Sequence, residues 1–137
     1  MSPTAVHRPL APESLAPPAA NYALAVASEG VSRLLHTSGV VPTRPDGSVP
    51  DADGPEGLAE QAEVVWSSIA ALVGEAGMAM TDIVSITTYV VVGYDLGPVM
   101  AVRDRYLGDH RSASTLVTVP ALAQDAWKME IAVIAAA

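Results

Sequence analysis

The stretch "DIVSITTYVVV", residues 82–92, predicts a buried strand, and the elements on either side of it decide the fold. Most of its side chains are β-branched, which favours a strand over a helix. Before it, apolar side chains recur at steps of three and four and predict one face of a helix. They are Leu58, Ala62, Val65, Ile69, Leu72 and Ala76. After it, Asp95 and Pro98 begin a second, shorter helix that ends at Gly108.

The first helix has recognisable signals at both ends. Asp53 precedes Glu56 by three residues, as in a capping box, and Pro55 suits a first helical turn. Gly77 is typical of the residue that follows a helix. We therefore expect the helix to begin close to Asp53 and to end before Gly77.

Four further strands complete the expected fold. Glu29 and Gly30 form a tight-turn pair that predicts a hairpin of residues 22–27 and 31–38. Residues 114–119 and 127–135 are expected to be the last two strands. This order, β-β-α-β-α-β-β, indicates an α/β fold, an α+β sandwich with both helices on one face of a mixed sheet. No third helix is available for the other face, which predicts self-association.

The chain of 137 residues is expected to form a single domain over residues 16–137. Residues 1–15 are interpreted as an extended lead-in, within a segment rich in proline and alanine. This segment lacks the basic-then-apolar pattern of a signal peptide. No apolar stretch approaches the roughly 20 residues of a membrane span. These observations predict a cytoplasmic protein that does not bind membranes.

The charge and the residue types exclude several classes of function. The formal net charge is −8, and Lys128 is the only lysine. Such a surface repels phosphate backbones, so no nucleic-acid partner is expected. The chain has no cysteine, which excludes disulfides and thiolate chemistry. His7, His36 and His110 do not have the spacing of metal ligands, and no metal site is expected.

Five short stretches occur in a recognisable order along the chain. They are "NYALAV", "HTSGVVP", "DGSV", "EAGMAMTDIVSITTYVV" and "WKMEIAVIA". Together they resemble the Rid family, which is also called the YjgF family or the reactive intermediate deaminase superfamily. The resemblance extends over residues 16–136, which is essentially the whole expected domain.

The resemblance implies a chorismate-mutase-like fold in a homotrimer, with clefts between neighbouring subunits. The best-known members of the family hydrolyse enamines and imines such as 2-aminoacrylate, and release ammonia and a 2-keto acid. They use neither a metal nor an organic cofactor. We accordingly expect a homotrimer that binds a small molecule in these clefts and needs no cofactor.

Ser114 marks a departure from the family pattern. The deaminating members hold the substrate carboxylate with an arginine in a Pro-Ala-Arg-Ser segment, because a guanidinium pairs with a carboxylate in a bidentate geometry. By resemblance, residues 112–115 occupy this segment and Ser114 stands at the arginine position. Arg103, Arg105 and Arg111 are the candidates to replace it, but their positions favour solvated helix or loop charges. The missing arginine predicts negligible turnover of 2-aminoacrylate.

Two residues are expected to be catalytic by resemblance. Glu130 matches the glutamate that family members use near the catalytic water, which suits a general acid or base. Its alternative is a structural carboxylate at a subunit interface. Tyr22 matches a tyrosine at the mouth of the cleft, and its alternative is an ordinary aromatic side chain on a strand.

Four residues are expected to bind the substrate. Ser38 in "TSG" offers a hydroxyl to a polar substrate, or it stabilises the turn at the end of a strand. Ser114 and Thr115 are expected to shape the site. Met100 stands where the family often has an asparagine, and its loss alongside the arginine indicates a less charged ligand.

Different classes of function fit this set of residues. The first is an enzyme that hydrolyses an imine or enamine, or moves a proton in a related reaction. The alternative is a trimer that binds or senses a metabolite and leaves it unchanged. The family is also sometimes credited with ribonuclease activity, but the acidic composition of this chain argues against it.

Overall fold

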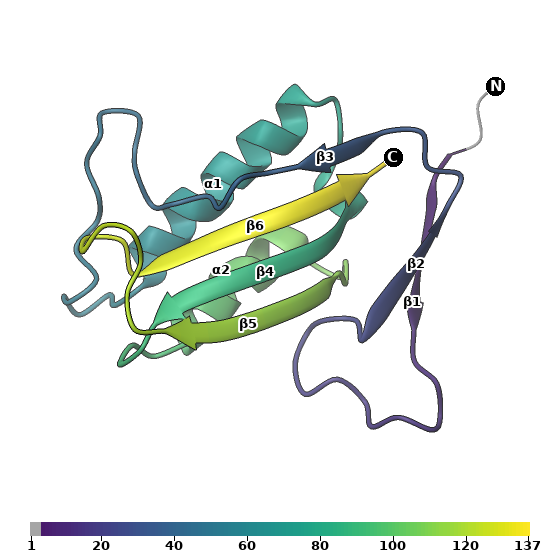
Figure 1. Cartoon of the computed structure of the whole chain (residues 1–137), viewed down its shortest axis with the longest axis horizontal. Helices are drawn as coiled ribbons and strands as arrows, with labels where there is room; N and C mark the ends of the chain where they lie inside the picture. The colour runs from purple at the N-terminus through teal and green to yellow at the C-terminus, as the bar shows by residue number, and fades with distance from the viewer. Residues whose placement is uncertain (1–3) are drawn as a thin grey trace.

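A computed structural model describes residues 4–137 as a sheet with helices packed against it (Figure 1). The strands are β1 (Val6–Leu10), β2 (Ala25–Glu29), β3 (Leu34–His36), β4 (Ile83–Val91), β5 (Ala113–Val119) and β6 (Met129–Ala136). The helices are α1 (Ala59–Glu75) and α2 (Gly97–Leu107), with a short 3₁₀ turn, η1 (Met80–Asp82), before β4.

The main sheet has the strand order β3-β6-β4-β5. β4 and β5 are parallel, and α2 connects them, because parallel neighbours need a crossover. β6 runs antiparallel to both β4 and β3. This arrangement leaves β5 at one edge of the sheet.

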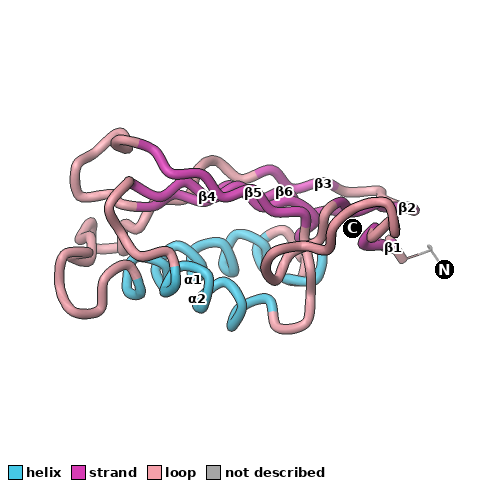
Figure 2. The backbone as a smooth tube through the Cα atoms, turned by 90° about the horizontal axis from the view of Figure 1, so that it is seen from below, coloured by secondary structure: helices cyan, strands magenta, loops and turns pink. Residues whose placement is uncertain are grey.

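Both helices lie on the same face of the main sheet, as Figure 2 shows. The side chains of β6 alternate accordingly: Met129, Ile131 and Val133 are buried beneath the helices, and the residues between them are half-buried on the other face. Trp66 of α1 is fully buried and stacks on Tyr106 of α2, with 6.1 Å between ring centroids. The predicted α/β class and the position of both helices are thus confirmed.

The predicted hairpin of residues 22–27 and 31–38 is wrong. β2 pairs with β1 in a separate two-stranded sheet, and β3 pairs with β6 in the main sheet. Gly30 does adopt a positive φ of 71°, so the turn signal was real. The turn sends the chain from one sheet to the other, because each strand finds its partner far away in the sequence. β1, which the sequence did not indicate, lies within the segment interpreted as a lead-in.

The predicted capping box at Asp53 is also wrong. α1 begins at Ala59, and no side chain caps its N-terminus. The Asp53 carboxylate instead accepts a hydrogen bond of 2.7 Å from the Tyr94 hydroxyl. The buried Leu58 precedes the helix, so packing rather than capping decides where it starts.

Gln61 is a buried polar residue that ties the loops to α1. Its side-chain amide donates to the carbonyls of Pro50 (2.8 Å) and Ala126 (2.9 Å). Its carbonyl accepts from the backbone N–H of Lys128 at 3.0 Å. These three hydrogen bonds satisfy backbone groups of two loops that the helix would otherwise leave unpaired.

The face of the main sheet opposite the helices carries no covering element within residues 4–137 (Figure 2). Tyr89 and Glu130 lie side by side on it, in register on β4 and β6. Val117 follows on β5 beside Tyr89 and is 40% exposed. The same part of the chain contains no helix with the length and hydropathy of a membrane span.

Candidate functional site

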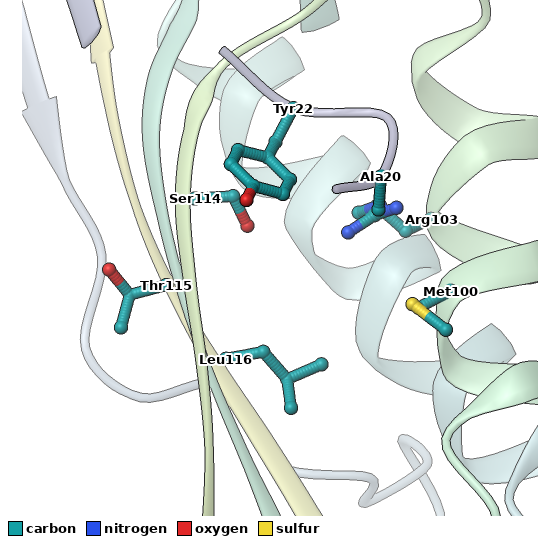
Figure 3. A pocket seen from close by; sticks show the side chains of 7 residues that line it. All are labelled: Ala20, Tyr22, Met100, Arg103, Ser114, Thr115 and Leu116. Carbon is teal, nitrogen blue, oxygen red and sulfur yellow. The ribbon is translucent and has the colours of Figure 1, made fainter. Parts of the chain in front are cut away.

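A pocket of about 360 Å³ lies between the edge strand β5 and helix α2 (Figure 3). The residues that line it are Ala20, Tyr22, Met100, Arg103, Ser114, Thr115 and Leu116. Its size is at the lower end of the range of small-molecule sites. The pocket brings together four of the residues predicted from the sequence, which are Tyr22, Met100, Ser114 and Thr115.

Tyr22 reaches the pocket from a bend that precedes β2, not from a strand. The backbone N–H of Ala23 donates to the carbonyl of Ser112 at 2.9 Å, which fastens the bend to the start of β5. The side-chain amide of Asn21 donates to Asp104 Oδ2 at 3.0 Å, which fastens it to α2. The bend therefore spans the two walls of the pocket and holds the Tyr22 ring between them.

The side chains of β5 alternate between two faces. Ser114 and Leu116 lie on the pocket side of the strand, whereas the Thr115 side chain points away from α2 (Figure 3). The Ser112 hydroxyl donates to the carbonyl of Ile83 at 2.7 Å and anchors the segment just before the strand. Thr115 consequently borders the pocket but offers its hydroxyl to the opposite face.

Arg103 lies in the pocket, and this corrects the expectation of a solvated charge. Its side chain is only 8% exposed and extends from α2 towards the cavity (Figure 3). Nε and Nη2 both lie 3.0 Å from Oδ1 of the neighbouring Asp104. The pair partly neutralises the buried charge, which would otherwise carry a large desolvation cost.

Arg105 and Arg111 do not line the pocket. Arg105 forms an ion pair with Glu63 of α1, and both side chains are well exposed. Arg111 donates from Nη1 to the carbonyls of Gly108 (2.7 Å) and His110 (3.1 Å). Their expected roles as surface and loop charges fit these contacts.

Glu130 lies apart from the pocket within one chain. It projects from the face of β6 opposite the helices and borders Gly39. It is separated from the edge strand β5 by β4, a distance of roughly 10 Å at the usual strand spacing. Within residues 4–137, no side-chain hydrogen bond to the Glu130 carboxylate is found.

Ser38 is exposed two residues after β3 ends, next to Gly39. A Cβ atom at Gly39 would overlap Oε2 of Glu130 and lie 2.6 Å from its Cδ and 2.9 Å from its Cγ, so a side chain at this position would force the carboxylate to shift. The predicted residues thus form two groups. Tyr22, Met100, Ser114 and Thr115 line the pocket, while Ser38 and Glu130 lie outside it, both next to Gly39.

Metal-binding side chains do not gather anywhere in the described part of the chain. No group of three or more histidine, aspartate or glutamate residues is arranged to hold an ion in residues 4–137. Figure 3 shows that the polar atoms around the pocket belong to hydroxyl groups and one guanidinium.

Comparisons with known proteins identify similar chains. The family described as Endoribonuclease L-PSP matches residues 13–137. YyfB from Yersinia pestis, a protein of unknown function of the conserved Rid family, is 27% identical with a TM-score of 0.82, over 96% of this chain and 98% of that one. The YjgF gene product from E. coli is 30% identical with a TM-score of 0.65, over 94% of this chain and 98% of that one.

A third similar structure contains a small molecule. It is E. coli TdcF with bound serine, which is 26% identical with a TM-score of 0.66 and is covered over 93% of both chains. No protein with a curated description matches this chain.

Proposed function

Because this chain belongs to the Rid (YjgF) family, we propose that it hydrolyses small reactive imines or enamines without a cofactor, in clefts between the subunits of a homotrimer. The observation that carries the proposal is the composition of the pocket. Tyr22, Met100 and Ser114 come from three distant segments, and each stands at a position that the family resemblance assigns to the site. Their convergence on one cavity of suitable size supports a small-molecule site there.

A second copy of the chain is needed to complete this site. Glu130 lies on the open face of the sheet and two strands away from β5, so the Glu130 of the same chain does not reach the pocket. The half-buried Tyr89 and the exposed Val117 lie on that open face and offer apolar surface to another subunit. We propose that the trimer places Glu130 and Ser38 of one subunit opposite the pocket of the next.

Each group then has a defined part in the hydrolysis of an imine. The Glu130 carboxylate accepts a proton from water as the water oxygen adds to the carbon of the C=N bond. The same proton passes to nitrogen and gives a carbinolamine. A second proton then moves from the carbinolamine hydroxyl to its nitrogen as the C–N bond breaks, and the products are ammonia and a carbonyl compound. For an enamine, protonation of the β-carbon with loss of an N–H proton gives the imine first. The hydroxyls of Tyr22 and Ser114 orient the substrate, and Met100 packs against its apolar part.

The serine at position 114 sets the expected preference among substrates. A serine hydroxyl does not form the two parallel charged hydrogen bonds that an arginine makes with a carboxylate. We therefore propose that 2-aminoacrylate, whose carboxylate family members hold from this position, is a poor substrate.

An imine-competition assay tests the proposal. An amino-acid oxidase generates the imine, semicarbazide traps it, and a loss of semicarbazone reports hydrolysis by the added protein. Wild type is compared with S114R. Hydrolysis by wild type that E130Q abolishes is the expected result, with S114R gaining activity towards 2-aminoacrylate. If wild type and S114R are both inactive on every imine supplied, the proposal is refuted.

The alternative is a trimer that binds a metabolite without turning it over. The separation of Glu130 from the pocket within one chain favours this alternative, because a protein that only binds its ligand does not need a catalytic base beside it. A saturating ligand that raises the melting temperature and is recovered unchanged would identify this case. The ribonuclease activity named in the family description is disfavoured by the net charge of −8, and an absence of RNA binding at low salt would exclude it.

A further inference from the structure

Arg103 owes its place in the pocket to the spacing of α2. Val99, Arg103 and Leu107 are four residues apart, and all three are buried on the same side of the helix. A guanidinium on the buried face must find partners, because an isolated buried charge is very costly. The spacing therefore places the positive charge of Arg103 on the side of α2 that faces β5 across the pocket.

The contacts of Arg103 leave part of its guanidinium unused. Nε and Nη2 are taken by Asp104 Oδ1, and Asp104 is itself held by the side-chain amide of Asn21. Within residues 4–137, no hydrogen bond from Nη1 to the protein is found, and Nη1 is not sealed away in the interior. Because Arg103 lines the cavity and Asp104 takes Nε and Nη2, Nη1 is the guanidinium nitrogen that remains for a ligand.

The other polar groups of the pocket also present donors. The Tyr22 hydroxyl oxygen accepts from the backbone N–H of Ala19 at 3.3 Å, which leaves its own proton free to donate. The Ser114 hydroxyl forms no hydrogen bond to the protein in the described residues and faces the same cavity. None of the residues that line the pocket is acidic, in a chain whose net charge is −8. Such a set of donors suits an acceptor-rich ligand.

We propose that Arg103 is the anion-binding residue of this pocket and that its ligand carries a carboxylate, held at the α2 wall by Nη1 with Tyr22 and Ser114 as neutral donors. This inference rests on the proposed function and names the class of substrate. The family arginine would contact the carboxylate from β5, whereas Arg103 contacts it from α2. The ligand therefore binds in the reverse orientation, with its carboxylate towards α2. A carboxylate held at this wall differs from the less charged ligand expected from the sequence, and it leaves 2-aminoacrylate, in its usual orientation, a poor substrate.

The test measures binding, so that it is independent of turnover. The probes are 2-oxobutanoate, a stable 2-keto acid, and its methyl ester, which removes the charge and adds one methyl group. Affinities are measured by calorimetry for wild type, R103M, R103K and R105M. Arg105 is the matched control because it lies on the same helix but is exposed and outside the pocket.

Wild type and R105M should bind the acid more tightly than the ester. R103M should weaken binding of the acid at least about tenfold and leave the ester unchanged, since a buried charge-assisted hydrogen bond is lost. R103K, which keeps a cation, should retain part of the preference for the acid; if R103M does not fold, R103K decides the matter. The assignment would be overturned if wild type bound the acid and the ester equally well, or did not bind the acid. It would also be overturned if R105M lost as much affinity for the acid as R103M, or if a folded R103K showed no preference for the acid over the ester.

The outcomes separate this inference from the proposed function. A protein that binds the acid through Arg103 but hydrolyses no imine supports the inference and refutes the proposed hydrolase. A protein that hydrolyses imines equally well with R103M keeps the hydrolase and overturns the role of Arg103.

Discussion

Replacing Gly39 with alanine should displace the Glu130 carboxylate and reveal whether its position matters for activity. The new Cβ atom would lie 2.6 Å from Cδ of Glu130, and ordinary contact between such atoms begins at 3.4 Å. The carboxyl carbon must therefore retreat by at least about 0.8 Å, and Oε2, which lies nearer still to the new Cβ atom, must move farther. Gly39 does not have a positive φ, so the substitution acts through this contact and not through backbone strain.

The expected effect on activity is large and the effect on stability is small. A misplacement of about 1 Å at a reacting group costs roughly 10²-fold in rate. Overpacking a side chain that is only half-buried should destabilise the fold by about 1 kcal/mol, which corresponds to a fall of roughly 4 °C in Tm. A rate loss without unfolding is thus the signature of a displaced carboxylate.

The imine-competition assay measures the rate, and thermal melting checks the fold. G74A is the matched control, because a Cβ atom at Gly74 would meet nothing within 4 Å and α1 should gain a little stability. E130Q should lose activity without a steric clash. Since both changes act on one group, the double variant G39A/E130Q should be no slower than E130Q alone.

Two results would refute this reasoning. The first is a G39A protein that keeps the wild-type rate while E130Q is inactive, which would mean that the carboxylate tolerates the displacement. The second is a double variant far slower than E130Q, which would mean that Gly39 acts through the backbone.

The remaining predictions concern stability and ionisation. Q61L should lower the free energy of unfolding by about 3 kcal/mol, because it leaves buried backbone groups unpaired; urea denaturation checks this, and a loss below about 1 kcal/mol would contradict it. The hydrogen bond to Asp53 raises the pKa of Tyr94. This hydrogen bond therefore contributes fully to the stability of the fold below the ordinary tyrosine pKa, and the contribution is lost as the pH rises through the pKa of the folded state. D53N should bring this pKa back down, as followed by tyrosinate absorbance, and an unchanged titration would show that the hydrogen bond is not its cause. The hydrogen bond from the Ser48 hydroxyl is the largest cause that lowers the pKa of Asp46, and the hydrogen bond from the Ser48 backbone N–H is the next. The stability that these bonds give is present above the ordinary aspartate pKa and is lost as the pH falls through the pKa of the folded state. S48A should raise this pKa only partway, because the backbone hydrogen bond remains; an NMR titration that shows no rise would count against the hydroxyl.

Local patterns predicted the elements that depend on near neighbours. The three-and-four spacing before residue 82 and the β-branched run after it correspond to α1 and β4 in the structure. The signal at Asp53 failed because a capping motif competes with packing, and the burial of Leu58 decided where the helix begins. The hairpin failed because a turn at Gly30 does not specify which strands pair on either side of it.

The candidate site was predicted in part, and what was missed has an identifiable cause. The resemblance singled out Tyr22, Met100 and Ser114 by position, and the structure places them around one pocket. Arg103 was interpreted as a solvated charge of the second helix, whereas the structure buries its side chain in the pocket. Its spacing of four from both Val99 and Leu107 was the signal that would have placed it on the buried face.

The sequence by itself determined the class of fold, the family and the absence of an arginine at position 114, because each of these is written in local pattern or in residue identity. Only the tertiary structure decided that a cation enters the same pocket from α2 and that Glu130 faces away from it. The contact between Asn21 and Asp104, which closes the pocket, joins residues 83 positions apart. No local periodicity specifies such a contact, because it exists only once the sheet and the helices have packed together.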